Sequence, residues 1–121
     1  MTQARLSLGA WGEDQAADYL RRLGLKIVAR NFSTPVGEVD IIARSKKELI
    51  FIEVKTRRSN AYGTPAEAVG PRKQRQIIRT AQWYLTAEKS RLQPRFDVVG
   101  VMPDGEGGAR IEHLPAAFEM E

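Results

Sequence analysis

Residues 38-EVDIIARSKKELIFIEVK-55 carry the clearest structural pattern in the chain, that of two β-strands joined by a short turn. Branched aliphatic side chains dominate both arms, as is usual in strands. Lys46 and Lys47 are the natural loop residues, which places Ser45 opposite Glu48. Four ionisable residues interrupt the apolar pattern in the two arms: Glu38, Asp40, Glu53 and Lys55.

Antiparallel pairing around this loop predicts which residues of the hairpin face each other. It places Asp40 opposite Glu53 and Glu38 opposite Lys55, and directly opposed residues share a face of the sheet. One face is then continuously apolar, with Val39, Ile41, Ala43, Ile50, Ile52 and Val54. The other face carries Ile42 and Phe51 nearest the turn, followed by the ionisable residues. A slip of one residue would destroy this division, so we expect this register.

Two opposed carboxylates in a sheet need a physical reason. Like charges in this position cost about 0.2–1 kcal/mol when exposed, and burial raises that cost or raises the pKa of one group. A bound cation removes the conflict, and Mg²⁺ commonly uses one or two carboxylates together with water and phosphate oxygens. Lys55, on the same face, could then orient or deprotonate a water, or contact a phosphate. For each residue alone, a solvated face with a Glu38–Lys55 salt bridge is the simpler interpretation. For Asp40, Glu53 and Lys55 together we favour a chemical site, because neighbouring Ile42 and Phe51 indicate a partly covered face.

The composition is that of a soluble globular protein. The 121 residues, 42% hydrophobic and 28% charged, are enough for one domain spanning residues 1–121. The absence of cysteine excludes disulfides and thiolate metal sites, and a single histidine argues against a zinc cluster. No leader-like segment or long apolar run is present, so we expect a cytoplasmic location and no membrane partner.

Basic side chains gather in two windows of the sequence, within a net charge of +4. The first contains Arg44, Lys46, Lys47, Lys55, Arg57 and Arg58, and the second contains Arg72, Lys73, Arg75 and Arg79. Such clusters suit a polyanion, nucleic acid first. On charge alone, two solvated basic faces are equally consistent with the pattern.

The rest of the chain predicts the order α-β-β-β-α-β-β. Helices are expected over 4–23 and 71–89, strands over 25–29, 38–44, 48–56, 95–102 and 109–114, and single helical turns over 65–69 and from Pro115. The buried stripes of the two helices are predicted to be Ala16, Ala17, Leu20 and Leu23, and Ile77, Ile78, Ala81, Tyr84 and Leu85. Glu13 falls on the first stripe, and Thr64 and Glu67 have capping-box spacing. His113 is expected at the surface or the core edge.

The pattern of Asp40, twelve residues and then Glu53-Val54-Lys55 resembles the PD-(D/E)xK nuclease superfamily, although Val39 stands where that motif has proline. Longer segments resemble one bacterial family, the uncharacterised YraN family, described as Holliday-junction-resolvase-like. The matching segments lie at 12–32, 37–44, 51–69, 71–77, 95–101 and 111–118, and the chain is identified as a member on this basis.

The resemblance implies a restriction-endonuclease-like α/β fold, a three-layer core in which helices flank a mixed β-sheet. It implies Asp40, Glu53 and the Val54 carbonyl as ligands of Mg²⁺, for which Mn²⁺ substitutes, and Lys55 as the residue that positions water. Glu13 would complete the catalytic set; the alternative is a partly exposed glutamate paired with an arginine. A glutamine on the following helix should lie near the site. Of Lys73, Gln74 and Gln76, we prefer Gln74.

The function expected from this resemblance is a metal-dependent endonuclease that binds and cleaves structured or branched DNA, with RNA left open. The residues expected to contact nucleic acid are Arg57, Arg58, Tyr62, Arg72, Lys73 and Arg75. Junction resolution takes two coordinated cuts and would require a homodimer. Two alternatives are a nucleic-acid-binding module without independent catalytic activity and an interaction protein whose basic faces bind an acidic partner.

Overall fold

The computed structural model describes residues 2–59 and 63–120, with the side chains of residues 2–7 and 66 left outside it. Its elements are α1 (Thr2–Arg22), β1 (Lys26–Thr34), β2 (Gly37–Arg44), β3 (Glu48–Thr56), the short 3₁₀ turn η1 (Ala66–Ala68), α2 (Pro71–Glu88), β4 (Gln93–Pro103) and β5 (Ala109–Phe118). The predicted order α-β-β-β-α-β-β is confirmed. No helix in the described part of the chain is both long enough and apolar enough to span a membrane.

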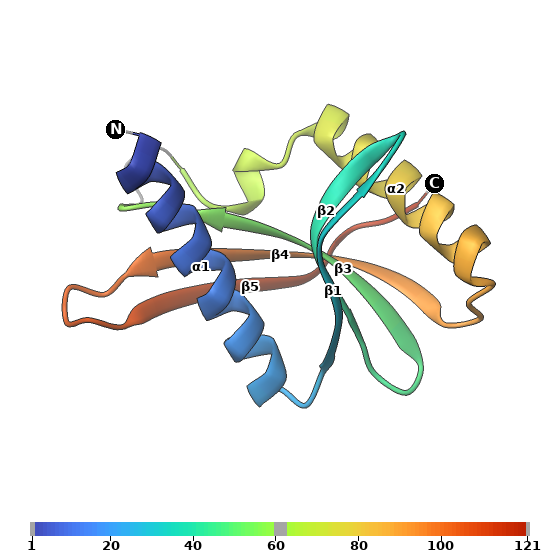
Figure 1. The fold of residues 1–121 in the computed structure, drawn as a ribbon, viewed down its shortest axis with the longest axis horizontal. Coiled ribbons are helices and arrows are strands. Elements are labelled where there is room, and N and C mark those ends of the chain that lie inside the picture. The colour runs from blue at the N-terminus through green and yellow to red at the C-terminus, as the bar shows by residue number, and fades with distance from the viewer. Residues whose placement is uncertain (1, 60–62, 121) are drawn as a thin grey trace.

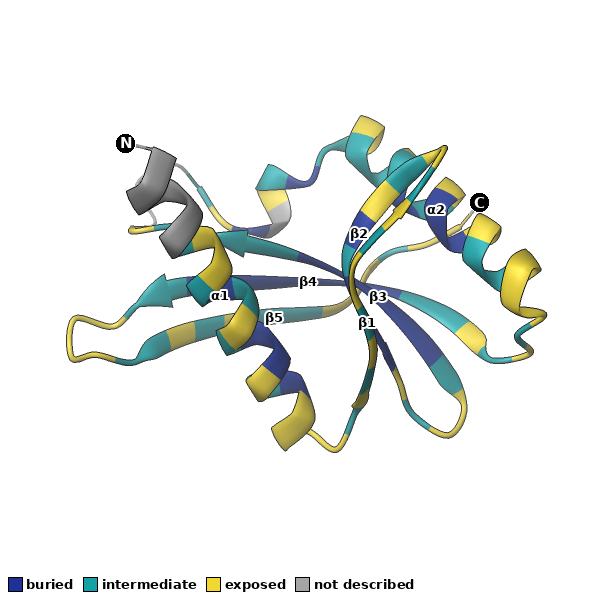
Figure 2. Cartoon of the chain, viewed as in Figure 1, coloured by how far each residue is buried: buried dark blue, intermediate teal, exposed yellow. Residues whose placement is uncertain are grey.

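The five strands form one mixed sheet in the order β1-β2-β3-β4-β5 (Figure 1). Strands β3 and β4 are parallel, and the other neighbours are antiparallel. A parallel pair needs a crossover connection, and α2 supplies it between β3 and β4. Helix α1 packs on one face of the sheet and α2 on the other. The result is the expected three-layer α/β core, with β3 and β4 buried at its centre (Figure 2).

Each helix covers its own hydrophobic cluster. The cluster under α1 contains Ala16, Ala17, Leu20, Ile41, Ala43, Ile50, Ile52, Val99 and Val101. The cluster under α2 contains Val39, Ile42, Leu49, Phe51, Val69, Ile77, Ala81, Phe96 and Val98. The predicted stripe of α2 is confirmed, since Ile78, Tyr84 and Leu85 also pack against its cluster. Leu23 was wrongly placed in the α1 stripe: it is 54% exposed, because the helix ends at Arg22 and the chain turns at Gly24.

The C-terminal tail continues β5 instead of forming the expected helical turn after Pro115. Its end is held by Phe118, which pairs with Phe96 of β4 and stacks on it at a centroid distance of 5.2 Å. Pro115 is tolerated because the register shifts between Phe96 and Val98, and because β5 is an edge strand. At this irregularity the backbone N–H of Ala116 donates to the Asp97 carboxylate at 3.0 Å.

The hairpin of β2 and β3 has the predicted register over its paired part. The partners are Ile41 and Ile52, Ile42 and Phe51, Ala43 and Ile50, and Arg44 and Leu49. The Ser45 N–H donates to the Glu48 carbonyl at 3.0 Å, which closes the turn at the two lysines.

Beyond Ile41 the two strands separate, because the β1–β2 hairpin bends away from β3 (Figure 1). The bend lies beside Asn31 of β1, which has a positive φ of 52°. It breaks the alternation of faces, so the placement of Val39 beside Ile41 was wrong, and Val39 packs in the α2 cluster. Glu38 is exposed and pairs with Ser33 rather than with Lys55. We call the place of separation the fork, made of Asp40 on β2 and Glu53, Val54 and Lys55 on β3.

Candidate active site

Asp40 is the first residue of β2 beyond the part that pairs with β3, and its side chain turns into the fork. Its Oδ2 atom accepts a hydrogen bond from the backbone N–H of Val54 at 2.8 Å. This carboxylate therefore replaces the backbone acceptor that continued strand pairing would have supplied. In a β-strand the N–H and C=O groups of one residue point to the same neighbouring strand, because a hydrogen-bonded antiparallel pair uses both groups. The carbonyl of Val54 consequently faces the fork together with Asp40.

Glu53 is the buried carboxyl group of the fork, and this residue is only 5% exposed. Burial raises its pKa to about 7, and the negative charge of Asp40 and a hydrogen bond between the two carboxyl groups add to the effect. The charges of Lys73 and Lys55 offset part of this rise. The predicted meeting of Asp40 and Glu53 is thus present, although the two residues are not a ladder pair.

Two lysines flank Glu53. The Nζ atom of Lys55 lies 3.5 Å from Glu53 Oε2, and the Nζ atom of Lys73 lies 3.8 Å from the same oxygen. Lys73 comes from the first turn of α2 and also donates to Gln76 Oε1 at 3.0 Å. The positions of Lys73 and Gln76 follow from helical geometry, since residues three apart share a face.

The expectation for Gln74 is not met. Its Nε2 atom donates to the Val69 carbonyl at 2.9 Å, and its side chain lines a separate pocket with Arg75 and Ile78. One residue along a helix turns the side chain by about 100°, which carries Gln74 away from the face that holds Lys73.

Glu13 reaches the fork from α1. Its side chain is 14% exposed and lines one groove with Asp40, Val54 and Lys55. Its Oε1 atom accepts hydrogen bonds from Arg30 Nε at 2.8 Å and from Asn31 Nδ2 at 3.0 Å. Glu13 therefore pairs with an arginine, as the alternative interpretation expected, and it also lines the groove; its catalytic role stays a prediction.

The helix comes this close because of Gly12. A Cβ atom at Gly12 would overlap the side chain of Thr56 on β3, so only glycine permits the contact. Glu13 is the next residue, and the approach of α1 to β3 therefore sets its position in the groove.

The residues predicted to contact nucleic acid do not form one cluster. Arg72 and Lys73 line a groove with Gln76 and Arg79 beside the fork, whereas Arg75 lies with Gln74 on the other side of α2. Arg58 is exposed after β3. Arg57 lines a pocket with Lys55. Tyr62 lies outside the described residues.

A polar network away from these groups was not predicted from the sequence. Asp97 is fully buried and accepts hydrogen bonds from Arg95 at 2.9 and 2.8 Å, from His113 Nε2 at 2.7 Å and from Ala116 N–H. Burial alone would raise the pKa of Asp97, but the hydrogen bonds from His113, Arg95 and Ala116 outweigh it and hold that pKa below its usual value. His113 also contacts Tyr19 of α1 at 2.9 Å. The network fastens β4, β5 and α1 together, and it places His113 at the core edge as expected.

The donors at the fork suit a hard cation. They are two carboxylates and one backbone carbonyl, all oxygen ligands of the kind that Mg²⁺ and Mn²⁺ prefer. A cation between the carboxyl groups would stabilise the ionised pair that the raised pKa of Glu53 shows to be costly. Among the described residues, no group of three or more His, Asp or Glu side chains is placed to hold a metal. Two carboxylates and one carbonyl would leave the other coordination positions of such an ion to water and substrate oxygens.

Comparisons with known proteins place most of the chain in one family. The model of the uncharacterised protein family UPF0102 matches residues 12–101, which include the fork and all of α2. The chain is 61% identical over 122 residues to a UPF0102 protein of Syntrophotalea carbinolica, covering 100% of this chain and 98% of that protein. It is 49% identical to a UPF0102 protein of Geobacter sulfurreducens, over 93% of this chain and 89% of that protein. A UPF0102 protein of Rhodococcus opacus is 46% identical over 93% of this chain and 97% of its own length.

Proposed function

The chain belongs to the uncharacterised protein family UPF0102, and from that premise we propose that it is a metal-dependent endonuclease of the PD-(D/E)xK type. It binds structured or branched DNA and hydrolyses a backbone phosphodiester. The family is the one that the resemblance to YraN proteins indicated. The nuclease assignment is our proposal, and it rests on the motif and on the fork.

One observation carries the proposal. Two carboxyl groups meet at the fork, and two lysines lie beside them, Lys55 on β3 and Lys73 on α2. Glu53 is buried next to Asp40, and both Lys55 and Lys73 lie within 4 Å of its Oε2 atom. Burying a carboxyl group beside a like charge lowers stability, and such arrangements gather at sites that do chemistry. The groove lined by Asp40, Val54 and Lys55 gives a substrate access to the Asp40 side of this pair.

In this proposal Asp40, Glu53 and the Val54 carbonyl would hold the ion. Bound there, Mg²⁺ supplies stabilisation of the negative charge that develops on the phosphoryl oxygens. Lys55 orients the attacking water by donating a hydrogen bond to its oxygen. Lys73, held by Gln76, contacts a phosphate oxygen of the substrate.

The basic side chains around the fork would bind the DNA backbone. Arg72 and Lys73 open α2 directly beside the fork, while Arg57 and Arg58 follow Lys55 at the end of β3. Contacts of this kind release counterions, so affinity should fall steeply with salt. Arg75 lies on the other side of α2 and would contact a more distant part of a branched substrate.

The proposal is tested by incubating purified protein with Mg²⁺ or Mn²⁺ and a panel of linear, flapped and four-way DNAs. We expect metal-dependent cleavage of at least one branched DNA, reduced about 100-fold or more in Asp40→Ala, Glu53→Ala and Lys55→Ala. Glu38→Ala is the matched control, because Glu38 lies on the same strand but is exposed and faces β1. Cleavage that survives in the Asp40 and Glu53 variants would overturn the proposal, as would the absence of cleavage on every DNA with both metals.

A second candidate is a nucleic-acid-binding module that has the same fold but no independent activity. The two lysines beside Glu53 favour it, because their charges already offset part of what a metal ion would neutralise. DNA binding at low salt without cleavage under any condition would support this function. RNA of the same branched form, titrated alongside, shows which nucleic acid is preferred. Failure to bind either one at low salt would instead favour an acidic protein partner.

A further inference from the structure

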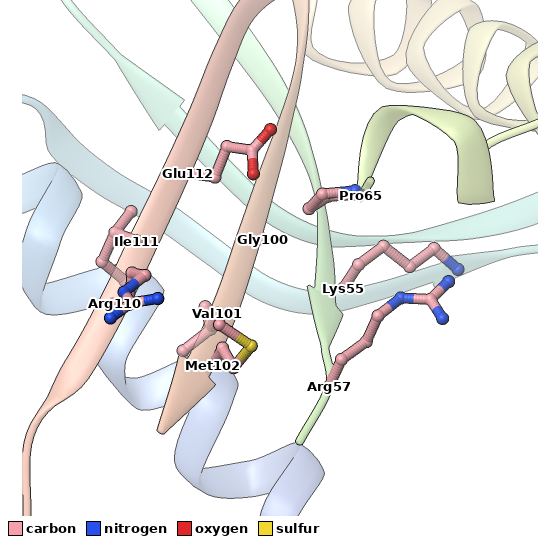
Figure 3. Close-up of a pocket in the computed structure, with 9 residues that line it drawn as sticks. All are labelled: Lys55, Arg57, Pro65, Gly100, Val101, Met102, Arg110, Ile111 and Glu112. Atoms are coloured by element: carbon pink, nitrogen blue, oxygen red, sulfur yellow. The ribbon is translucent and has the colours of Figure 1, made fainter. Parts of the chain in front are cut away.

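A further pocket shares Lys55 with the fork (Figure 3). Its nine lining residues are Lys55, Arg57, Pro65, Gly100, Val101, Met102, Arg110, Ile111 and Glu112. Lys55 and Arg57 come from β3, the middle of the pocket is Gly100 on β4, and Arg110 to Glu112 come from β5. We call it the Arg57–Arg110 pocket.

The strand register places the polar groups of this pocket on one face of the sheet. Gly100 pairs with Lys55 on one side and with Glu112 on the other, and Met102 pairs with Arg110. Paired residues share a face, so Lys55 and Glu112 stand on either side of a residue without a side chain.

Arg57 carries a buried, unpartnered donor at the β3 end of the pocket. Its backbone N–H donates to the Val101 carbonyl at 2.9 Å, which fixes the residue at the end of β3. Its Nε atom is buried and has no hydrogen-bond partner among the residues that the structure describes. A buried donor without a partner is costly, and a charged one more so. The terminal nitrogens of the same guanidinium group lie at the β3 end of the pocket, and the exposed Arg110 supplies a second guanidinium group at the β5 end (Figure 3).

The remaining lining suits a nucleobase. Met102 and Pro65 provide apolar surface, and the Pro65 ring packs directly over Gly100. Glu112 can accept from an exocyclic amino group of a base. The cavity measures about 210 Å³, below the roughly 300–1,000 Å³ of ordinary small-molecule pockets. Its size therefore fits one base and excludes a stacked pair.

Lys55 connects the two sites, since it lines both the Arg57–Arg110 pocket and the groove that holds Asp40 and Glu13. A strand whose scissile phosphate lies at the fork would bring its neighbouring nucleotide to this pocket. A base that is paired in a duplex cannot enter it.

We propose that the Arg57–Arg110 pocket binds one unpaired nucleotide next to the scissile phosphate. Its two flanking phosphates lie on Arg57 at the β3 end and on Arg110 at the β5 end, and its base lies between them against Met102 and Pro65. The substrate class is thus DNA with an unpaired nucleotide at the cut, as in a flap or an opened branch point. This inference rests on the proposed function, because only a nuclease has a scissile phosphate at the fork. Binding of a nucleotide in the pocket does not itself require cleavage.

The test measures binding without cleavage. A short single strand with one central 2-aminopurine is titrated with protein in the presence of a chelator, and its fluorescence is followed. We expect Arg57→Gln and Arg110→Gln each to weaken binding about ten-fold, as for the loss of a charged hydrogen bond, with partial recovery in Arg110→Lys. Arg91→Gln removes the same charge at an exposed site in another pocket and should bind like the unaltered protein. Arg110 is exposed on an edge strand, so its variants should fold, which thermal unfolding verifies.

The outcomes separate the two proposals. Equal binding by Arg91→Gln and Arg110→Gln, or equal competition by fully paired duplex, would overturn the assignment of the pocket. Arginine-dependent binding without cleavage in Mg²⁺ would support the pocket while removing the nuclease proposal. Metal-dependent cleavage that Arg110→Gln leaves unchanged on flapped and on continuous duplex DNA would retain the nuclease and overturn the pocket.

Discussion

The Oδ2 atom of Asp40 accepts a hydrogen bond from the backbone N–H of Val54 at 2.8 Å, so a side chain of β2 caps β3 at the point where the strands part. Asp40 therefore has two roles that can be separated. It satisfies a backbone donor, and it places a negative charge beside Glu53. The first role needs only an acceptor oxygen, whereas the second needs the charge.

The pair Asp40→Asn and Asp40→Ala separates these roles. Asn can keep the hydrogen bond to Val54 and removes the like charge beside Glu53, so this variant should unfold at the same urea concentration as the unaltered protein or at a higher one. Ala leaves the Val54 N–H without its partner, which should lower the free energy of unfolding by about 1–3 kcal/mol. Both variants should lose Mg²⁺ affinity, measured by calorimetry. Equal stability of the Asn and Ala variants would contradict the capping role.

Glu53 makes stability depend on pH near neutrality. Its pKa is about 7 in the folded protein against 4.5 ordinarily, because burial and Asp40 disfavour the charged form. A raised pKa means that the folded state binds the proton more tightly than the unfolded state. The stability that comes from the proton on Glu53 is therefore fully present below a pH of about 4.5, and it is lost as the pH rises through about 7. A shift of this size corresponds to roughly 3 kcal/mol.

The free energy of unfolding in urea, measured between pH 4.5 and pH 8.5, checks this dependence on Glu53. The unaltered protein should lose stability across this interval relative to Glu53→Gln, which cannot ionise. Saturating Mg²⁺ should restore part of the loss above neutral pH if the fork binds the ion. Parallel pH profiles for the two proteins would show that Glu53 is not the titrating group.

The close approach of α1 to β3 gives a prediction with a built-in control. Gly12→Ala places a methyl group against Thr56 and should destabilise the protein by about 1–3 kcal/mol, as other overpacking substitutions do. Gly9→Ala, one turn earlier in the same helix, meets nothing within 4 Å and should stabilise it by about 0.5–1 kcal/mol through helix propensity. Thermal unfolding compares the two. The idea fails if both substitutions shift stability in the same direction.

The sequence pattern predicted the hairpin well because alternation and turn length restrict a two-stranded register strongly. The pairing from Arg44 to Ile41, and the meeting of Asp40 with Glu53, could both be counted from Lys46 and Lys47. The bend at the fork could not, because it depends on the conformation of Asn31 on the neighbouring strand. That bend moved Val39 to the other face.

Which side chain at the start of α2 faces the fork could not be predicted, for a different reason. Lys73, Gln74 and Gln76 occupy its first two turns, before the buried Ile77 begins to define the inner face. Periodicity gives the relative positions of side chains on a helix but not which of them meets a neighbouring strand at the helix end. The contact depends on Gly37, whose missing side chain lets the β1–β2 turn approach Gln76.

The orientation of α2 yields the last prediction. Lys73→Met removes a charge that lowers the pKa of Glu53 and the phosphate contact proposed for Lys73, so the pKa of Glu53 should rise further and DNA binding should weaken. Gln76→Ala releases the Lys73 ammonium from its acceptor and should weaken DNA binding in the same direction, by about two- to ten-fold. Gln74→Ala, on the other side of the helix, should leave DNA binding unchanged. Titrations of one flapped DNA at two salt concentrations measure all three. A larger effect from Gln74 than from Gln76 would mean that the helix presents a different face to the substrate.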